Sequence, residues 1–166
     1  MTVDYLVGID LGLGGKGSPT AIAILDGSGA RVIKLATLRA VNDDPTMRTL
    51  MAGAQVAEIL TSVVPSRSNV RCAIEQAPFV QNALTAFRLA VAWGIYAARV
   101  YDVLGVVPRA IPPTIAKVNM TGNGRAEKED MIRMALQRYD VQANEHEADA
   151  IGIALSSGGA DDRGMG

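Results

Sequence analysis

The stretch that decides how this chain is organised is Tyr5-Leu-Val-Gly-Ile-Asp10-Leu-Gly-Leu-Gly-Gly-Lys-Gly17. Its apolar half predicts a buried strand that ends in a carboxylate and opens into a glycine-rich turn. A second apolar run, Val70-Arg-Cys-Ala-Ile-Glu75, ends in the same way, and Asp149 follows His146 by three residues near the C-terminus. A carboxylate that leaves water at the end of a buried strand needs a partner. Several that converge repel one another unless cations bind between them, so the pattern predicts a metal site.

The composition favours one globular domain in a reducing compartment. Of the 166 residues, 49% are hydrophobic, and we expect a single domain over residues 1–158 with a flexible tail at 159–166. No apolar run reaches the roughly 20 residues that cross a bilayer, and the first residues do not predict a signal peptide. The single cysteine, Cys72, lies in a predicted strand and has no partner for an internal disulfide. We therefore expect a cytoplasmic protein.

The charge does not decide whether the chain binds nucleic acid. Its formal net charge is −1, whereas nucleic-acid-binding domains are often strongly basic. The charge is unevenly spread, however, because residues 67–138 hold ten Lys and Arg against five Asp and Glu. This basic segment leaves DNA binding open.

The order of predicted elements indicates an α/β fold with a mixed five-stranded sheet flanked by helices. The expected strands cover residues 5–9, 20–25, 31–38, 70–74 and 109–112, the first three forming an antiparallel meander. The expected helices cover residues 44–63, 81–104, 114–118, 126–139 and 145–156, the first with Asp44 as N-cap and Pro45 at its first position. Its apolar positions are Leu50, Met51, Ala54, Ala57, Ile59 and Leu60. Helix 81–104 is apolar on more than one face, which predicts deep burial or contact with a partner chain.

Four short motifs then identify a family. They are Gly8-Ile-Asp10, Ala73-Ile-Glu-Gln76 with Asn82, Ala126-Glu-Lys128 and Ala148-Asp-Ala150. Their order and approximate spacing, over about residues 5 to 157, resemble those of RuvC-type Holliday-junction resolvases, including divergent phage-encoded members. The resemblance implies a ribonuclease-H-like fold, a homodimer, and metal-dependent symmetric nicking of four-way DNA junctions that leaves 5′-phosphate and 3′-hydroxyl ends.

By this resemblance the catalytic and metal-binding residues are Asp10, Glu75, His146 and Asp149. Oxygen ligands with one imidazole suit two Mg²⁺ ions about 4 Å apart, which Mn²⁺ can replace. His146 either ligates a metal ion or positions the attacking water. The sequence also admits a structural alternative for Asp10, in which its side chain caps its own turn.

Two glutamates also have structural interpretations that involve neither metal binding nor catalysis. Glu75 has an ion pair with Arg71 or Arg88 as its alternative. Glu147 forms a capping box with Asn144, so we assign it a structural role.

The resemblance also suggests residues that bind DNA. Lys117, Arg125 and Lys128 are candidates for phosphate contacts, the two lysines having a solvated helix surface as their alternative. The family places an aromatic residue shortly after its second carboxylate, where it stacks on bases at the junction centre. Here Pro78 occupies that position and Phe79 is displaced by one residue, so Phe79 either stacks on bases or lies in the core.

The turn after Asp10 departs from the family pattern. It is about four residues longer than usual, and Leu11 replaces a common proline. We expect this loop to border the active site and to alter sequence preference and substrate range.

Three other functions compete with the resolvase. One is a broader nuclease that also cuts forks and flaps, and another is a catalytically silent junction-binding protein. The third is a fragment of an actin-like or sugar-kinase ATPase, because Gly8-Ile-Asp-Leu-Gly12 resembles their phosphate loop. Those ATPases need two such domains, for which the chain is too short. A branch-migration partner is suggested by family analogy alone.

Overall fold

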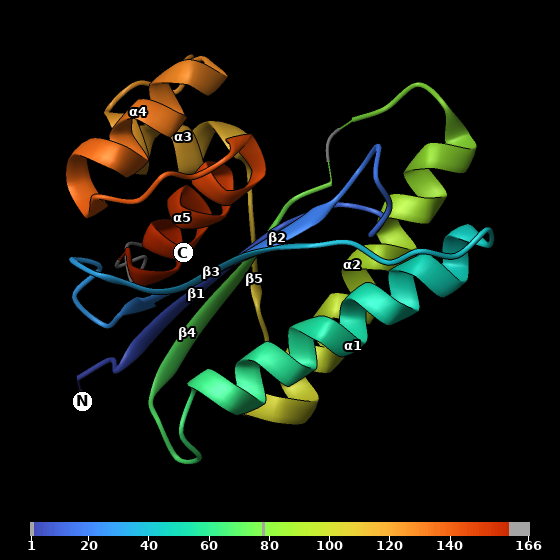
Figure 1. Ribbon diagram of the computed structural model, residues 1–166, viewed down its shortest axis with the longest axis horizontal. Helices are drawn as coiled ribbons and strands as arrows, with labels where there is room; N and C mark the ends of the chain where they lie inside the picture. The colour runs from blue at the N-terminus through green and yellow to red at the C-terminus, as the bar shows by residue number, and fades with distance from the viewer. Residues whose placement is uncertain (1, 78, 160–166) are drawn as a thin grey trace, which may run out of the picture.

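The computed structural model describes residues 2–77 and 79–159, which form a mixed five-stranded sheet with helices on both faces (Figure 1). β1 pairs antiparallel with β2, and β2 with β3, whereas β4 pairs parallel with both β1 and β5. The spatial order β3-β2-β1-β4-β5 places β1 at the centre. The predicted fold class is therefore confirmed. The strands are β1 (Tyr5–Asp10), β2 (Thr20–Asp26), β3 (Val32–Leu38), β4 (Val70–Glu75) and β5 (Arg109–Ile111).

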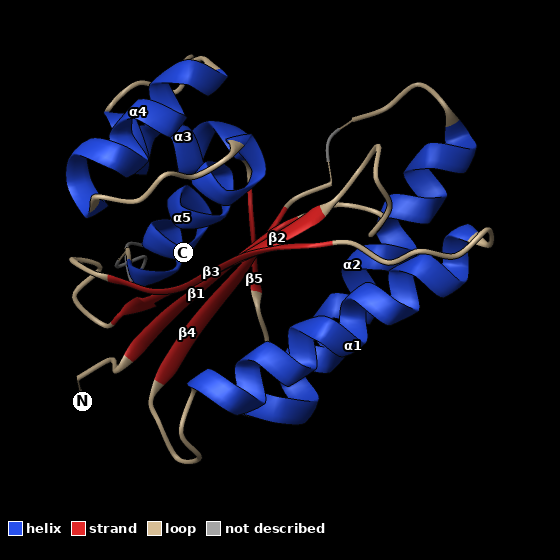
Figure 2. Cartoon of the chain, viewed as in Figure 1, coloured by secondary structure: helices blue, strands red, loops and turns tan. Residues whose placement is uncertain are grey.

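The five helices form two layers, one on each face of the sheet (Figure 2). One layer holds α1 (Pro45–Val63) and α2 (Ala83–Leu104), and the other holds α3 (Pro113–Thr121), α4 (Lys128–Tyr139) and α5 (Glu145–Gly158). Each face of the sheet has a hydrophobic core, and β1 contributes to both because its side chains alternate between the two faces. Val7 and Ile9 pack toward α1 and α2, while Leu6 packs toward α5.

Capping residues explain why two helices begin later than expected. Asn82 is the N-cap of α2, and its side chain accepts a hydrogen bond from the backbone N of Thr85 at 3.0 Å. The α4 helix starts at Lys128 because the backbone N of Glu127 is bonded to the carboxylate of Asp130 at 3.1 Å. Of the predicted tail, only Gly159 lies within the described residues.

The predicted core face of α1 was partly wrong. Leu50, Met51 and Ala54 are exposed, although Leu60 is buried as expected. The helix has more apolar residues than one face can hold, so their spacing alone does not say which of them face the sheet. The residues that do so are Thr49, Ala52, Gly53, Val56 and Leu60.

The α2 helix has two different apolar faces. Leu89, Ala92, Tyr96 and Val100 are buried in the core, while other apolar side chains of the helix remain exposed. Within residues 2–77 and 79–159, α2 is the one helix with the length and mean hydropathy to cross a membrane. It contains three charged side chains and packs on α1 and β4, so we interpret it as a core helix with one uncovered face.

The α5 helix crosses β1 so closely that only glycine fits at position 8. A Cβ atom there would lie 2.2 Å from the carbonyl oxygen of Ala150 and 2.3 Å from the backbone N of Ala154. Gly158, at the C-terminal end of α5, packs against Leu6, which precedes Gly8 in β1. The later part of α5 therefore lies on the earlier part of β1, and the two elements run antiparallel. This direction brings the first turn of α5 to the end of β1 at which Asp10 lies.

We predict that Gly8→Ala is strongly destabilising. The added methyl group meets backbone atoms that cannot rotate away, and overpacking of this kind costs about 1–3 kcal/mol or more. The free energy of unfolding in urea measures the loss. Gly17→Ala is the control, because a Cβ at position 17 meets nothing within 4 Å. Equal stability of the two variants would contradict the close packing of α5 on β1.

Candidate active site

Asp10 is the last residue of the central strand, and its side chain is paired with a histidine from α5. The residue is only 5% exposed, and one carboxylate oxygen, Oδ2, lies 2.8 Å from Nδ1 of His146. His146 belongs to the first turn of α5. The hydrogen bond to Asp10 is the main cause that raises the pKa of His146, which favours the imidazolium form.

Glu75 ends the strand next to Asp10. Because β4 runs parallel to β1, with Ile74 opposite Ile9, the two carboxylates emerge at the same edge of the sheet. Burial, followed by the negative charges of Asp10 and Asp149, raises the pKa of Glu75 to about 8. The alternative ion pair with Arg71 or Arg88 is wrong, since neither described arginine pairs with Glu75. Instead, the Arg71 guanidinium donates to the carbonyl of Gly158 at 2.9 Å.

Asp149 completes the acidic group from α5, one turn after His146. Burial, followed by the negative charge of Asp10, raises the pKa of Asp149 to about 6, although the charges of Lys117 and His146 lower it in part. The sheet edge and the start of α5 therefore bring together four predicted residues, and the charge of Lys117 acts on one of them, Asp149.

These side chains fit a hard divalent cation. The negative charge of Asp10 raises the pKa values of Glu75 and Asp149, and a cation between the three carboxylates would relieve that repulsion. The donors are carboxylate oxygens and one imidazole, while the buried thiol of Cys72 lies within β4. As the described side chains stand, no three of His, Cys, Asp or Glu surround a single point. Binding of a cation would therefore require rotation of some of these side chains.

The predicted DNA-binding residues differ in their surroundings. Lys117 on α3 is half-buried near Asp149, whereas Lys128 is exposed and forms an ion pair of 2.5 Å with Glu145. Arg125 is exposed, and its backbone N donates to the side chain of Asn123 at 3.0 Å. The lysines thus border the acidic group, while no contact in the described structure links the Arg125 side chain to it.

Phe79 is 95% exposed, so its alternative interpretation as a core residue was wrong. It lies four residues after Glu75, in the segment between β4 and α2. Pro78, which aligns with the family's aromatic residue, lies outside the described residues.

The predicted capping box at the start of α5 is present, and it extends to a residue that the sequence did not suggest. Asn144 Oδ1 accepts from the backbone N of Glu147 at 3.0 Å, and Glu147 Oε2 accepts from the backbone N of Asn144 at 3.1 Å. Thr37 on β3 also donates to Glu147 at 3.0 Å and accepts from the Asn144 amide at 2.8 Å. These bonds fix the first turn of α5, and therefore His146, to the sheet. Thr37 carries no motif, so only the structure reveals it.

The sheet order and the flanking helices define a class: this is an α/β protein of the ribonuclease-H-like fold. The chain belongs to the RuvC family, since the family model "Crossover junction endodeoxyribonuclease RuvC" matches residues 6–157. Members of this family are endodeoxyribonucleases that generally depend on metal ions.

Two solved structures are similar over most of the chain. Thermus thermophilus RuvC is 25% identical, with a TM-score of 0.69 and 92% of each chain covered. T. thermophilus RuvC in complex with a Holliday junction substrate is 24% identical, with a TM-score of 0.72 and 92% of this chain and 91% of that chain covered. No curated protein matches this sequence.

We predict that the metal-free protein loses stability as the pH rises from about 5 to 8. The pKa values of Glu75, Asp149 and His146 are all raised, so the folded state holds protons that the unfolded chain has released, and stability falls with pH. Thermal unfolding at several pH values measures this. Mg²⁺ should restore most stability near pH 8, where the carboxylates are charged. Glu75→Gln should flatten the slope, and an equally steep slope in that variant would contradict the assignment.

Proposed function

We propose that this protein is a Mg²⁺-dependent endonuclease that resolves four-way DNA junctions by symmetric paired nicks, leaving 5′-phosphate and 3′-hydroxyl ends. The observation that carries the proposal is the convergence of Asp10, Glu75, His146 and Asp149 in a chain of the RuvC family. We propose further that it acts in the cytoplasm of a bacterial or phage-infected cell.

Asp10, Glu75 and Asp149 would hold two Mg²⁺ ions, which Mn²⁺ can replace. When bound, such ions lower the pKa of an attacking water and stabilise the charge on the leaving 3′-oxygen. His146 holds a proton at Nδ1 against Asp10 in the absence of metal, and its ring stands at the site to ligate a metal ion or to orient the water. An imidazole in place of a fourth carboxylate adds no negative charge, which lowers the repulsion among the acidic residues.

Lys117 and Lys128 would contact the phosphates beside the scissile bond. Lys128 would exchange its ion pair with Glu145 for a phosphate. This exchange is inexpensive because exposed ion pairs contribute only about 0–1 kcal/mol. Arg125 is a further candidate for the DNA backbone, and the exposed ring of Phe79 is available to stack on an unpaired base at the junction centre.

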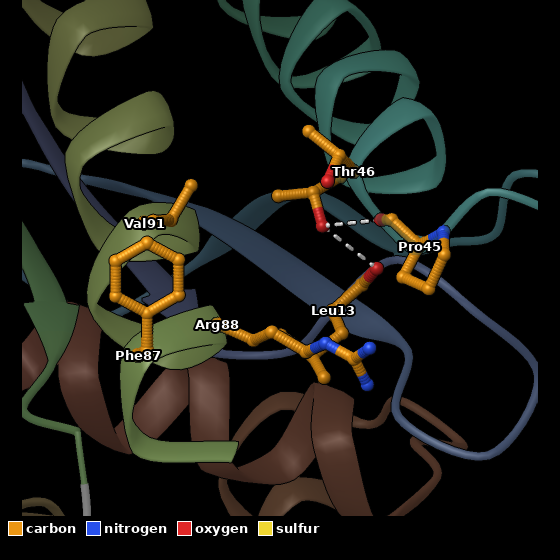
Figure 3. Close-up of a pocket in the computed structure, with 7 residues that line it drawn as sticks. Leu13, Pro45, Thr46, Phe87, Arg88 and Val91 are labelled. Carbon is orange, nitrogen blue, oxygen red and sulfur yellow. Dashed lines mark hydrogen bonds between the residues drawn. The ribbon is translucent and has the colours of Figure 1, made fainter. Parts of the chain in front are cut away.

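The uncovered face of α2 supports a homodimer. Leu84, Phe87 and Val91 are 55%, 67% and 37% exposed, so an apolar strip follows the first half of the helix. Phe87 and Val91 border a small hollow beside Pro45 of α1 (Figure 3). A two-fold symmetric junction suits a two-fold symmetric enzyme, in which each subunit cuts one strand. We therefore propose that a second copy of the chain covers this strip.

We predict that Asp10→Asn abolishes cleavage of a labelled, immobile four-way junction while junction binding persists. The substitution removes a charged ligand without changing the shape of the side chain. The assay compares the junction with linear duplex and Y-fork DNA, with and without Mg²⁺. Asp140→Asn is the control, because Asp140 is an exposed helix C-cap with a φ of 55°, a conformation that asparagine tolerates. Loss of binding together with cleavage would indicate a structural role for Asp10.

The substrates cut by the unmodified protein separate the competing functions. Metal-dependent paired nicks on opposing strands of the junction alone indicate a resolvase, and cutting of forks and flaps indicates a broader nuclease. Binding without cutting in either Mg²⁺ or Mn²⁺ indicates a silent junction-binding protein and contradicts the proposal.

We predict that Phe87→Glu converts a dimer into a monomer, because it places a charge in the apolar strip. Sedimentation should give a mass near twice that of the 17.4 kDa chain for the unmodified protein and near the single chain for the variant. Phe79→Glu, at an exposed aromatic residue outside α2, should leave the mass unchanged. A dimer that persists in Phe87→Glu would contradict the assignment of the interface to this strip.

A further inference from the structure

The long loop after Asp10, residues 11–19, is held by three different parts of the fold. Three successive carbonyl groups of the loop each accept one hydrogen bond. Gly12 accepts from the Tyr96 hydroxyl of α2 at 2.9 Å, Leu13 from the Thr49 hydroxyl of α1 at 3.2 Å, and Gly14 from the backbone N of Ala40 at 2.8 Å. Figure 3 shows Leu13 from this loop beside α1 and α2. The glycine-rich sequence therefore forms a fixed loop.

Both ends of the loop meet at one buried hydroxyl group. Tyr96 is fully buried, and its hydroxyl oxygen lies 2.7 Å from the Thr20 hydroxyl, at the start of β2. The Gly12 carbonyl can only accept, so the tyrosine proton goes to Gly12 and Thr20 donates to the tyrosine oxygen. Burial raises the pKa of Tyr96 to about 12, so the hydroxyl keeps its proton at any physiological pH. The Tyr96 hydroxyl thus links Gly12, which follows Asp10, to Thr20, which precedes Ala21. Asp10 and Ala21 are paired with each other in the sheet.

The loop is tightly packed at Gly12. A Cβ atom at position 12 would lie 2.0 Å from the carbonyl oxygen of Pro19. The backbone N of Leu13 donates to the carbonyl of Ser18 at 2.9 Å, so the two ends of the loop are also bonded to each other. Because Asp10 is only two residues from Gly12, a shift of the Gly12 backbone would also move the Asp10 carboxylate.

We propose that Tyr96 is a positioning residue for the active site: through the Gly12 carbonyl it fixes the orientation in which Asp10 faces Glu75 and Asp149. The inference rests on the proposed metal-dependent function. Phenylalanine would fill the same space in the core, and burying a hydroxyl is unfavourable unless it is hydrogen-bonded. The two bonds that this hydroxyl makes hold the two ends of the loop after Asp10, at Gly12 and at Thr20.

The expected effect of Tyr96→Phe is on metal affinity. The variant keeps the ring but frees the Gly12 carbonyl, so Asp10 is held less well. Loss of a group that orients a metal ligand typically weakens metal binding about 10–100-fold. We expect the Mg²⁺ concentration for half-maximal junction cleavage, and the Kd for Mn²⁺ titrated into the DNA-free protein, to rise at least about tenfold. Junction binding in Ca²⁺ should stay within about twofold.

Tyr139→Phe is the matched control. The Tyr139 hydroxyl also donates to a glycine carbonyl, that of Gly29, at 3.0 Å. That turn follows Asp26, which pairs with Tyr5 at the opposite end of β1 from Asp10. Both variants lose a tyrosine-to-glycine hydrogen bond, so a merely structural role predicts a lower thermal stability with unchanged Mn²⁺ binding in both. That result would overturn the proposal.

Two substitutions of Thr20 keep the test decisive if Tyr96→Phe does not fold. Thr20→Val removes the donor to the tyrosine oxygen, and Thr20→Ser keeps it. A weaker Mn²⁺ affinity in the valine variant, restored in the serine variant, supports the proposal, and equal affinities contradict it. Because Mn²⁺ binding is measured without DNA, failure of the unmodified protein to cut any junction would contradict the proposed function while leaving this comparison valid.

Discussion

The mutual repulsion of Asp10, Glu75 and Asp149 is the constraint on which the rest of the structure depends. Burial and neighbouring negative charge raise the pKa of Glu75 to about 8 and that of Asp149 to about 6, so the group is unfavourable by itself when charged. Packing away from the site holds it together. β1 and β4 are parallel neighbours, and α5 lies against β1 where Gly8 leaves room for its backbone.

Hydrogen bonds between distant elements then hold the start of α5 and the loop after Asp10 in place. The start of α5 is bonded to β3 through Thr37 and Glu147, and the loop after Asp10 is bonded to α2 through Tyr96. These contacts use groups that make no direct contribution to the chemistry. They limit how far the acidic residues can separate to relieve their repulsion, which keeps the group suited to a cation.

Some of the fold and site was predictable because the signals were local. The strand that ends at Asp10, the cap and proline at the start of α1, and the capping box of Glu147 depend on neighbours in the sequence, and each was predicted. The core face of α1 was not, because its surplus of apolar residues fits more than one rotation of the helix. The exposure of Phe79 was left open for a related reason, since an aromatic residue in a loop suits either core or surface.

The sequence by itself determined the order of the strands and helices, the ends of two strands at Asp10 and Glu75, and membership of the RuvC family. Periodicity, caps and motif spacing carry that information because they act over a few residues. Only the tertiary structure decided that neither Arg71 nor Arg88 pairs with Glu75, that Lys128 pairs with Glu145, and that Tyr96 reaches the loop after Asp10. Those contacts join residues far apart in the chain, and the packing of helices on the sheet sets their distances.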